Sequence, residues 1–138
     1  MSRYGIDAPT LLHLVANGLV ADSGHQLVAP NTIRSEAMHL LLTDVRAGRR
    51  SDREALGLHE RMTELKLRVL GDRVSRTTAW RIARDQNWDT LRDAEYLAVT
   101  RLQADALVTI DPSLATKAEG IVPLAPLEAL LRPVDAAQ

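Results

Sequence analysis

Short apolar runs alternate along this chain with longer segments in which apolar residues recur at helical spacing. The apolar runs end at turn-forming or polar residues, and they predict strands at residues 4–6, 26–29, 65–70, 106–110 and 121–122. Strands that alternate with helices form a parallel sheet. The sequence therefore predicts an α/β fold with an open, mostly parallel sheet of four to five strands, flanked by helices on both faces.

The expected helices are marked by residues that favour a first helical turn. These helices start near Pro9, Asn31 or Thr32, Ser51 or Asp52, Ser75, Thr90 and Pro112, with one or two further turns at 126–131. We expect residues 1–132 to form one domain and residues 133–138 to fray.

The composition is typical of a globular domain rather than a disordered chain, because 46% of the 138 residues are hydrophobic and 25% are charged. No apolar run is long enough to cross a membrane, and the first residues lack the pattern of a secretory signal. We therefore expect a cytoplasmic protein without a membrane partner. Since the chain has no cysteine, any metal ligand must be oxygen or imidazole.

The basic residues are concentrated in the middle of the chain, although the net charge is only −1. Residues 46–101 hold 13 of the 17 Lys and Arg and carry a net charge of +4, whereas residues 1–45 and 102–138 carry −2 and −3. Most of these residues are arginines, whose guanidinium groups suit bidentate contacts with phosphate. The alternative is that the arginines simply line solvated helix faces.

Four acidic residues stand where an α/β sheet places its ligands. Asp7 and Asp111 each follow a predicted strand, and Glu36 and Asp93 each lie in the first turn of a predicted helix. If the four converge, their mutual repulsion raises their pKa values unless divalent cations occupy the cluster. Ligands that are all oxygen favour Mg²⁺ or Mn²⁺.

Each acid also has an explanation without chemistry. Asp7 and Asp111 are good helix N-caps, Thr90 and Asp93 match a capping box, and Glu36 near a helix start interacts favourably with the helix dipole. These alternatives stay open for each acid taken alone.

Two other acids are expected outside such a cluster. Glu95 is two residues from Asp93 and is turned to another face of the same helix. Asp105 precedes its strand and is expected at the opposite end of the sheet.

The four acids stand in motifs that resemble the PIN-domain ribonucleases, and among them the VapC toxins of bacterial VapBC toxin-antitoxin pairs. The motifs are residues 4–8, 34–37, 93–98 and 107–111, and Thr109 matches the hydroxyl position common in the family. The resemblance covers essentially the whole chain and implies a PIN-like fold for the domain. Arg92 departs from the pattern, because an aromatic residue often precedes the third acid.

The resemblance implies a metal-dependent endoribonuclease toxin of a type II toxin-antitoxin system. Asp7, Glu36, Asp93 and Asp111 would then hold one or two Mg²⁺ or Mn²⁺ ions and support hydrolysis of RNA by water. It also implies a homodimer and a cognate VapB-type antitoxin. With RNA as the substrate, we expect phosphate contacts from the Arg-rich helices at Arg76, Arg81 and Arg84.

The remaining aromatic and imidazole side chains are interpreted more simply. Core or dimer packing is the favoured use of Trp80 and Trp88, with base stacking as the alternative. We expect the four histidines to be surface or half-buried residues without a catalytic role; they are His13, His25, His39 and His59.

Two other functions compete with the nuclease. The first is a PIN fold that has lost its activity and serves as a binding or scaffold protein; its metal site would respond little to Mn²⁺. The second is a receiver-like signalling domain, which needs adjacent early acids and a Lys after a late strand. Asp7 stands alone and Lys117 is expected in a helix, so the sequence disfavours this second alternative.

Overall fold

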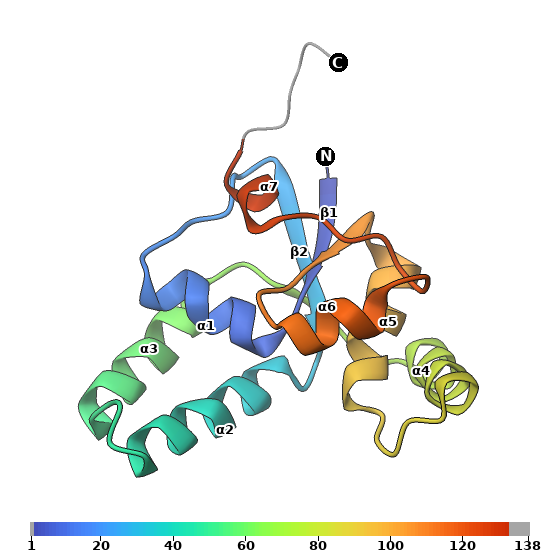
Figure 1. Cartoon of the computed structure of the whole chain (residues 1–138). Coiled ribbons are helices and arrows are strands. Elements are labelled where there is room, and N and C mark those ends of the chain that lie inside the picture. Colours follow the sequence, from blue (N-terminus) through green and yellow to red (C-terminus); the bar gives the residue numbers. More distant parts are fainter. Residues whose placement is uncertain (1, 133–138) are drawn as a thin grey trace.

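The computed structural model describes residues 2–132, which form four strands and seven helices (Figure 1). The strands are β1 (Ser2–Ile6), β2 (His25–Pro30), β3 (Arg68–Leu70) and β4 (Ala106–Val108). The helices are α1 (Ala8–Ala16), α2 (Ile33–Arg46), α3 (Asp52–Glu64), α4 (Arg73–Gln86), α5 (Arg92–Gln103), α6 (Pro112–Ala118) and α7 (Leu127–Leu131). The expected fraying of residues 133–138 lies outside the described residues.

The four strands form one sheet in the order β3-β2-β1-β4, and every pairing is parallel. Tyr4 of β1 is in register with Leu27 on one side and Ala106 on the other. Because the strands are parallel, their carboxyl ends meet at one edge of the sheet. The prediction of an α/β fold with an open parallel sheet is confirmed.

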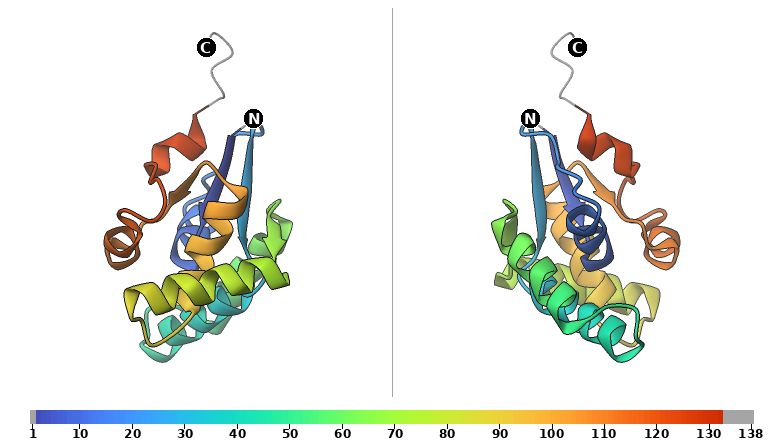
Figure 2. Two further views of the ribbon diagram at one scale, coloured as in Figure 1. Left: turned by 90° about the vertical axis from the view of Figure 1, so that its right-hand side faces the viewer. Right: turned by 90° about the vertical axis from the view of Figure 1, so that its left-hand side faces the viewer.

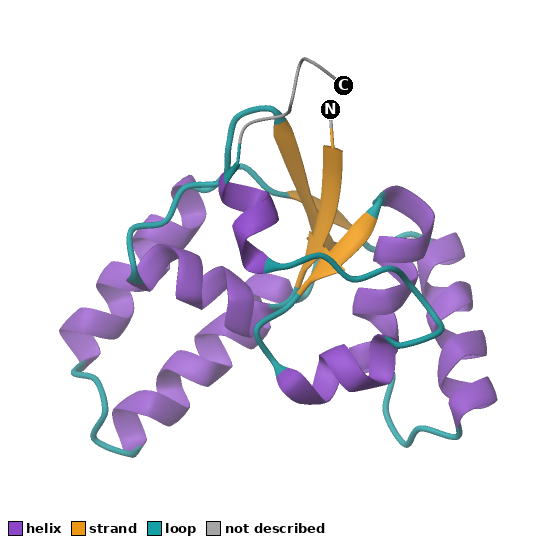
Figure 3. Cartoon of the chain, turned by 45° about the horizontal axis from the view of Figure 1, so that its top comes forward, coloured by secondary structure: helices purple, strands orange, loops and turns teal. Residues whose placement is uncertain are grey.

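Helices lie on both sides of this sheet (Figure 3). The two side views show α2 and α3 in front of the strands from one direction and α4, backed by α5, from the other (Figure 2). The contacts agree, since α1, α2 and α3 touch one another while α5 packs on β1, β2, β4 and α4. No helix of the described residues is long and apolar enough to span a membrane.

The core is built from apolar side chains of the strands and of the inward helix faces. Among the fully buried ones are Ile6, Leu11, Ile33, Leu41, Leu97 and Leu107. Burial of this size, about 1.5–3 kcal/mol for each large side chain relative to an exposed one, fixes α5 against the sheet and α2 against α1 and α3. The elements that carry the four acids are therefore anchored.

The fifth predicted strand, at residues 121–122, does not form. Ile121 and Val122 instead close the end of α6, where both amides bind the Ala118 carbonyl. The only pairing in this part of the described chain is an isolated parallel bridge between Leu107 and Leu124. Pro123 and Pro126 flank that bridge and have no N–H to extend a ladder, so a strand cannot grow there.

The strands predicted at 65–70 and 106–110 are shorter than expected. The first is reduced to β3 and the second to β4. Beyond β4, the amide of Ile110 donates to the Thr10 hydroxyl at 3.0 Å rather than to a neighbouring strand. A side chain of α1 thus ends the ladder three residues before Asp111.

Two helix starts also differ from expectation. Helix α5 begins after Leu91, which makes no side-chain cap, so the capping box predicted from Thr90 and Asp93 is wrong. Asp93 is the second helical residue instead of the third, which leaves its carboxylate free for another partner. Helix α4 begins after Asp72, which accepts from the Ser75 amide, rather than at Ser75 itself.

Candidate functional site

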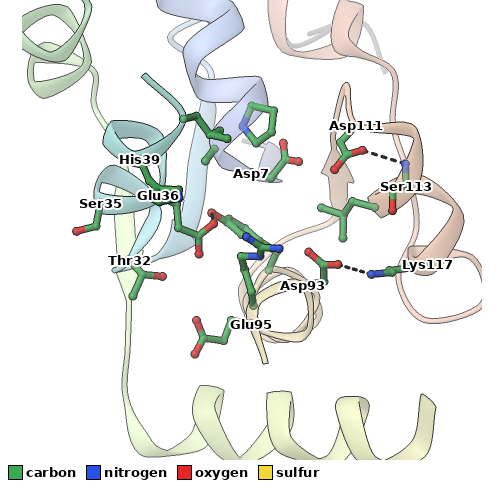
Figure 4. Close-up of a pocket in the computed structure, with 16 residues that line it drawn as sticks. Asp7, Thr32, Ser35, Glu36, His39, Asp93, Glu95, Asp111, Ser113 and Lys117 are labelled. Atoms are coloured by element: carbon green, nitrogen blue, oxygen red, sulfur yellow. Dashed lines mark hydrogen bonds and ion pairs between the residues drawn. The ribbon is translucent and has the colours of Figure 1, made fainter. Parts of the chain in front are cut away.

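A cleft of about 730 Å³ opens where β1 and β4 end, between the first turns of α1, α2, α5 and α6. All four acids singled out from the sequence line it: Asp7, Glu36, Asp93 and Asp111 (Figure 4). They come from four separate elements, as expected for the carboxyl edge of a parallel sheet. The fold therefore brings together residues that are up to 104 positions apart in the chain.

Asp7 is the most enclosed of the four, with 2% of its surface exposed. It is the N-cap of α1, and its carboxylate accepts from the Thr10 amide, from the Thr10 hydroxyl, and from the Thr109 hydroxyl at 2.7 Å. Burial raises the pKa of Asp7 above its ordinary value, and the hydrogen bonds from Thr10 and Thr109 only partly oppose this. Asp7 is therefore both the N-cap of α1 and a residue of the cleft, as predicted.

Thr109 connects Asp7 to the loop that carries Asp111. Its hydroxyl donates to Asp7 and accepts from the Asp111 amide at 3.0 Å. On the same side, the Thr10 hydroxyl accepts from the Ile110 amide. These hydrogen bonds hold the segment between β4 and α6 against the end of β1. Thr109 therefore fixes the position of Asp111 relative to Asp7.

Glu36 lies in the first turn of α2 and accepts a 2.8 Å hydrogen bond from the hydroxyl of Tyr96. Burial is the main reason that the pKa of Glu36 is raised; Tyr96 and Arg92 lower it, while Glu95 and Asp93 add to the rise. The pKa of Tyr96 is itself raised, first by burial and then by the charge of Glu36. Tyr96 therefore remains a hydrogen-bond donor throughout the physiological pH range.

Asp93 and Asp111 lie on the side of the cleft opposite Glu36, and each carboxylate has a partner there (Figure 4). The Asp93 carboxylate forms an ion pair with Lys117 of α6, with 2.7 Å between Oδ2 and Nζ. Asp111 is the N-cap of α6 and accepts from the Ser113 amide at 2.9 Å. For Asp111, as for Asp7, the predicted cap and the position in the cleft are both correct.

Each carboxylate is thus engaged by a partner of its own, and within residues 2–132 no three His, Asp or Glu side chains are grouped closely enough to hold one metal ion. The donor set nevertheless fits a hard divalent cation in kind, because all four side chains offer carboxylate oxygen. Burial raises the pKa values of Asp7 and Glu36, and a cation in the cleft would favour their charged forms.

Glu95 also lines the cleft, and nothing in the structure tests its expected exclusion from the cluster of four acids. The helix turns its side chain away from Asp93, but the cleft is wide enough to include both faces. Thr32 and Glu95 also line a second cavity of about 140 Å³, together with Arg76. Asp105 is at the opposite end of the sheet as expected, where it accepts from the Arg3 amide.

The other residues noted in the sequence are spread over the surface. Arg76, Arg81 and Arg84 are exposed on α4. Trp88 packs partly against the core, whereas Trp80 is 59% exposed, so core packing of Trp80 within the chain is wrong. His39 is exposed and lines the cleft, and the remaining histidines are half-buried: His13, His25 and His59.

Three residues that bind the acids were not expected from the sequence. Thr10 could have been found, because it stands three residues after an N-cap, where side chain and amide both face the cap. Tyr96 also carries a signal, because it is three residues from Asp93 and shares its side of α5. Lys117 carries none, because its contact with Asp93 joins two helices 24 positions apart.

No protein-family model matches this chain, and no curated protein matches it. A solved structure that does match is described as "Crystal structure of PAE2754 from Pyrobaculum aerophilum". It is 24% identical, covers 94% of both chains and superposes with a TM-score of 0.68. The two chains therefore share their α/β fold over nearly their whole length.

Proposed function

We propose that this chain is a PIN-domain endoribonuclease that depends on Mg²⁺ or Mn²⁺, and that it acts as a VapC-type toxin of a type II toxin-antitoxin pair. The observation that carries the proposal is the meeting of four carboxylates from four elements in one cleft at the carboxyl edge of a parallel sheet. The order of the four motifs in the sequence supports it further. On this proposal residues 1–132 are the PIN domain, which acts in the cytoplasm as a homodimer and is bound by a VapB-type antitoxin.

Asp7, Glu36, Asp93 and Asp111 would hold one or two ions in this cleft. A bound divalent ion supplies a water of lowered pKa and offsets charge at the phosphate that is attacked. The chain's own residues prepare the site. Thr10 and Thr109 fix both oxygens of Asp7, and Tyr96 fixes Glu36, so the carboxylates are oriented before substrate arrives.

Cellular RNA incubated with the purified protein tests this proposal directly. We expect discrete fragments with Mn²⁺ or Mg²⁺ and none with EDTA, because without an ion nothing in the cleft generates hydroxide near neutral pH. Fragment ends mapped by sequencing would then identify the target. Fragments that persist in EDTA would contradict the proposal.

The competing function is a PIN fold that only binds a partner. One observation favours it, namely that every acid already has a partner within the chain. Thermal unfolding with and without Mn²⁺ separates the two. Mn²⁺ at about 100 times its Kd stabilises a site that binds it by roughly 2.7 kcal/mol, whereas a degenerate site responds little.

Arg76, Arg81 and Arg84 are proposed to contact RNA phosphates. Arg76, Trp80 and Arg84 follow one another at intervals of four residues and therefore share one face of α4. Arg76 also lines the cavity of about 140 Å³ that adjoins the acidic cleft. RNA binding is measured with an Asp93→Asn variant, which allows binding without cleavage. Replacing Arg76 and Arg84 with Ala is expected to weaken binding about tenfold and to reduce the slope of log K against log salt by about 1 for each lost contact.

Arg53→Ala is the matched control for these variants, because Arg53 is exposed on α3, on the other side of the sheet. It should leave both the affinity and the salt slope unchanged. An equal loss in the control would show that any surface arginine serves, and would remove α4 from the proposed RNA contact.

A further inference from the structure

Lys117 occupies a position that the proposed function does not use. Its ammonium lies 2.7 Å from Asp93 Oδ2 and 5.5 Å from the centre of the Trp88 ring. Lys117 is on α6 and Asp93 is on α5, so the ion pair joins two helices that line the cleft (Figure 4). The ammonium thus has two partners, one anionic and one aromatic.

The ion pair between Lys117 and Asp93 is partly exposed to solvent. The side chains of Lys117 and Asp93 are 40% and 26% exposed, and ion pairs at such exposure contribute little to stability. Lys117 and Asp93 also line a third cavity, of about 260 Å³ beside Trp88, which leaves room for the lysine to move. A competing cation of higher charge can therefore displace it.

A divalent ion in the cleft would compete for the same carboxylate. Lys117 and Asp93 both line the cleft, and the ammonium holds Oδ2 of this carboxylate. A monovalent ammonium and a divalent cation repel each other at contact distance, so one carboxylate does not bind both at full strength.

We propose that Lys117 is an exchangeable counter-ion of Asp93: it binds this carboxylate when the cleft holds no divalent cation and is released when one binds. This inference rests on the metal site of the proposed function. Lys117 then sets the concentration at which the site fills, and its release alters the surroundings of Trp88. It is a positioning residue for Asp93.

Trp88 gives a readout that is independent of RNA cleavage. In a Trp80→Phe background the only remaining tryptophan is Trp88, and titration with Mg²⁺ is expected to change its emission as the ammonium leaves. Calorimetry measures the Kd of Mg²⁺ in parallel. In Lys117→Met, which keeps the length of the side chain without its charge, Mg²⁺ should bind without this emission change and with a Kd about fivefold lower, equal to about 1 kcal/mol.

Two further variants separate exchange from a general effect of charge. Arg92→Met removes another cation that lines the cleft but makes no ion pair with Asp93, so its Kd for Mg²⁺ should change by less than that of Lys117→Met. Lys117→Arg keeps the competing charge and should restore a Kd near that of the unmodified protein. Thermal unfolding of each variant checks that it is folded.

The outcomes distinguish this inference from the proposed function. If Mg²⁺ binds, but Trp88 emission is the same with and without Lys117 and both proteins have the same Kd, the exchange is wrong and the metal site stands. If Lys117→Met and Arg92→Met tighten binding equally, a general charge effect replaces the exchange. If neither Mg²⁺ nor Mn²⁺ binds to any variant, the metal site itself is wrong and the inference is overturned with it.

Discussion

Asp7→Asn is expected to lower RNA cleavage by about a thousandfold while raising the stability of the protein at neutral pH. A loss of that size equals about 4 kcal/mol in the activation barrier, and it follows if the buried carboxylate is a ligand of the ion that supplies the nucleophile. The gain in stability follows because burial disfavours the charged form of this 2%-exposed carboxylate, and asparagine replaces it with an uncharged side chain of the same shape. We expect about 1 kcal/mol, the size of a typical stabilising substitution.

The pH dependence of this gain follows from the raised pKa of Asp7. Folding favours the protonated form, so the contribution of this carboxyl to stability is fully present below its unfolded pKa and is lost as the pH rises through its folded pKa. The asparagine lacks this dependence. The advantage of Asp7→Asn should therefore be largest at neutral pH and shrink towards about pH 4.

Thermal unfolding from pH 4 to 8 in EDTA measures this stability, and RNA cleavage with Mn²⁺ measures the activity. Asp105→Asn is the control, because Asp105 is an exposed acid at the opposite end of the sheet. It should retain activity. If Asp7→Asn is less stable than the unmodified protein at pH 7, the hydrogen bonds from Thr10 and Thr109 outweigh the cost of burial. If it cleaves RNA normally, Asp7 is not part of the site.

Gly5→Ala is expected to destabilise the fold by about 3 kcal/mol, the upper end of the usual cost of overpacking. A methyl group at this position would overlap the hydroxyl of Thr100, where α5 lies directly on β1. Thr100 is 1% exposed and its hydroxyl donates to the Tyr96 carbonyl at 2.8 Å, so it cannot turn aside freely. Because Asp7 follows β1 and Tyr96 is on α5, the cleft would be disturbed as well.

Urea unfolding followed by circular dichroism measures this effect, and the chain offers a matched control. Gly57 is in the interior of α3 with no atom near an added methyl group, so Gly57→Ala should stabilise the protein by about 1 kcal/mol. Adding Thr100→Ala to Gly5→Ala removes the hydroxyl and should recover most of the loss. Equal stability of Gly5→Ala and the unmodified protein would show that α5 and β1 can separate without cost.

The local pattern of residues was enough to predict the class of fold and the four acids that line the candidate site. Strand and helix periods depend on neighbours within a few positions, so the alternation of elements could be read from the chain. The same holds for Asp7 and Asp111, because an acid after a strand and before a proline-initiated helix is both a cap and a residue of the ligand-binding edge. Glu36 and Asp93 followed from their places in first helical turns.

Tertiary structure decided which side chains contact the acids. The hydrogen bonds of Glu36 with Tyr96 and of Asp7 with Thr109 join residues 60 and 102 positions apart, and the ion pair of Asp93 with Lys117 joins two helices. Such contacts depend on the order β3-β2-β1-β4 and on how closely α5 and α6 approach the sheet, which no local period encodes.

Some ends of helices and strands depend on local sequence, and others depend on tertiary contacts. The sequence by itself determined the start of α3, where Ser51 and Glu54 form a capping box. Only the folded chain decided that residues 121–122 close α6 rather than pair with β4, and that Thr10 ends β4. A backbone amide takes the partner that the whole fold brings nearest, and that partner is set by packing of distant segments.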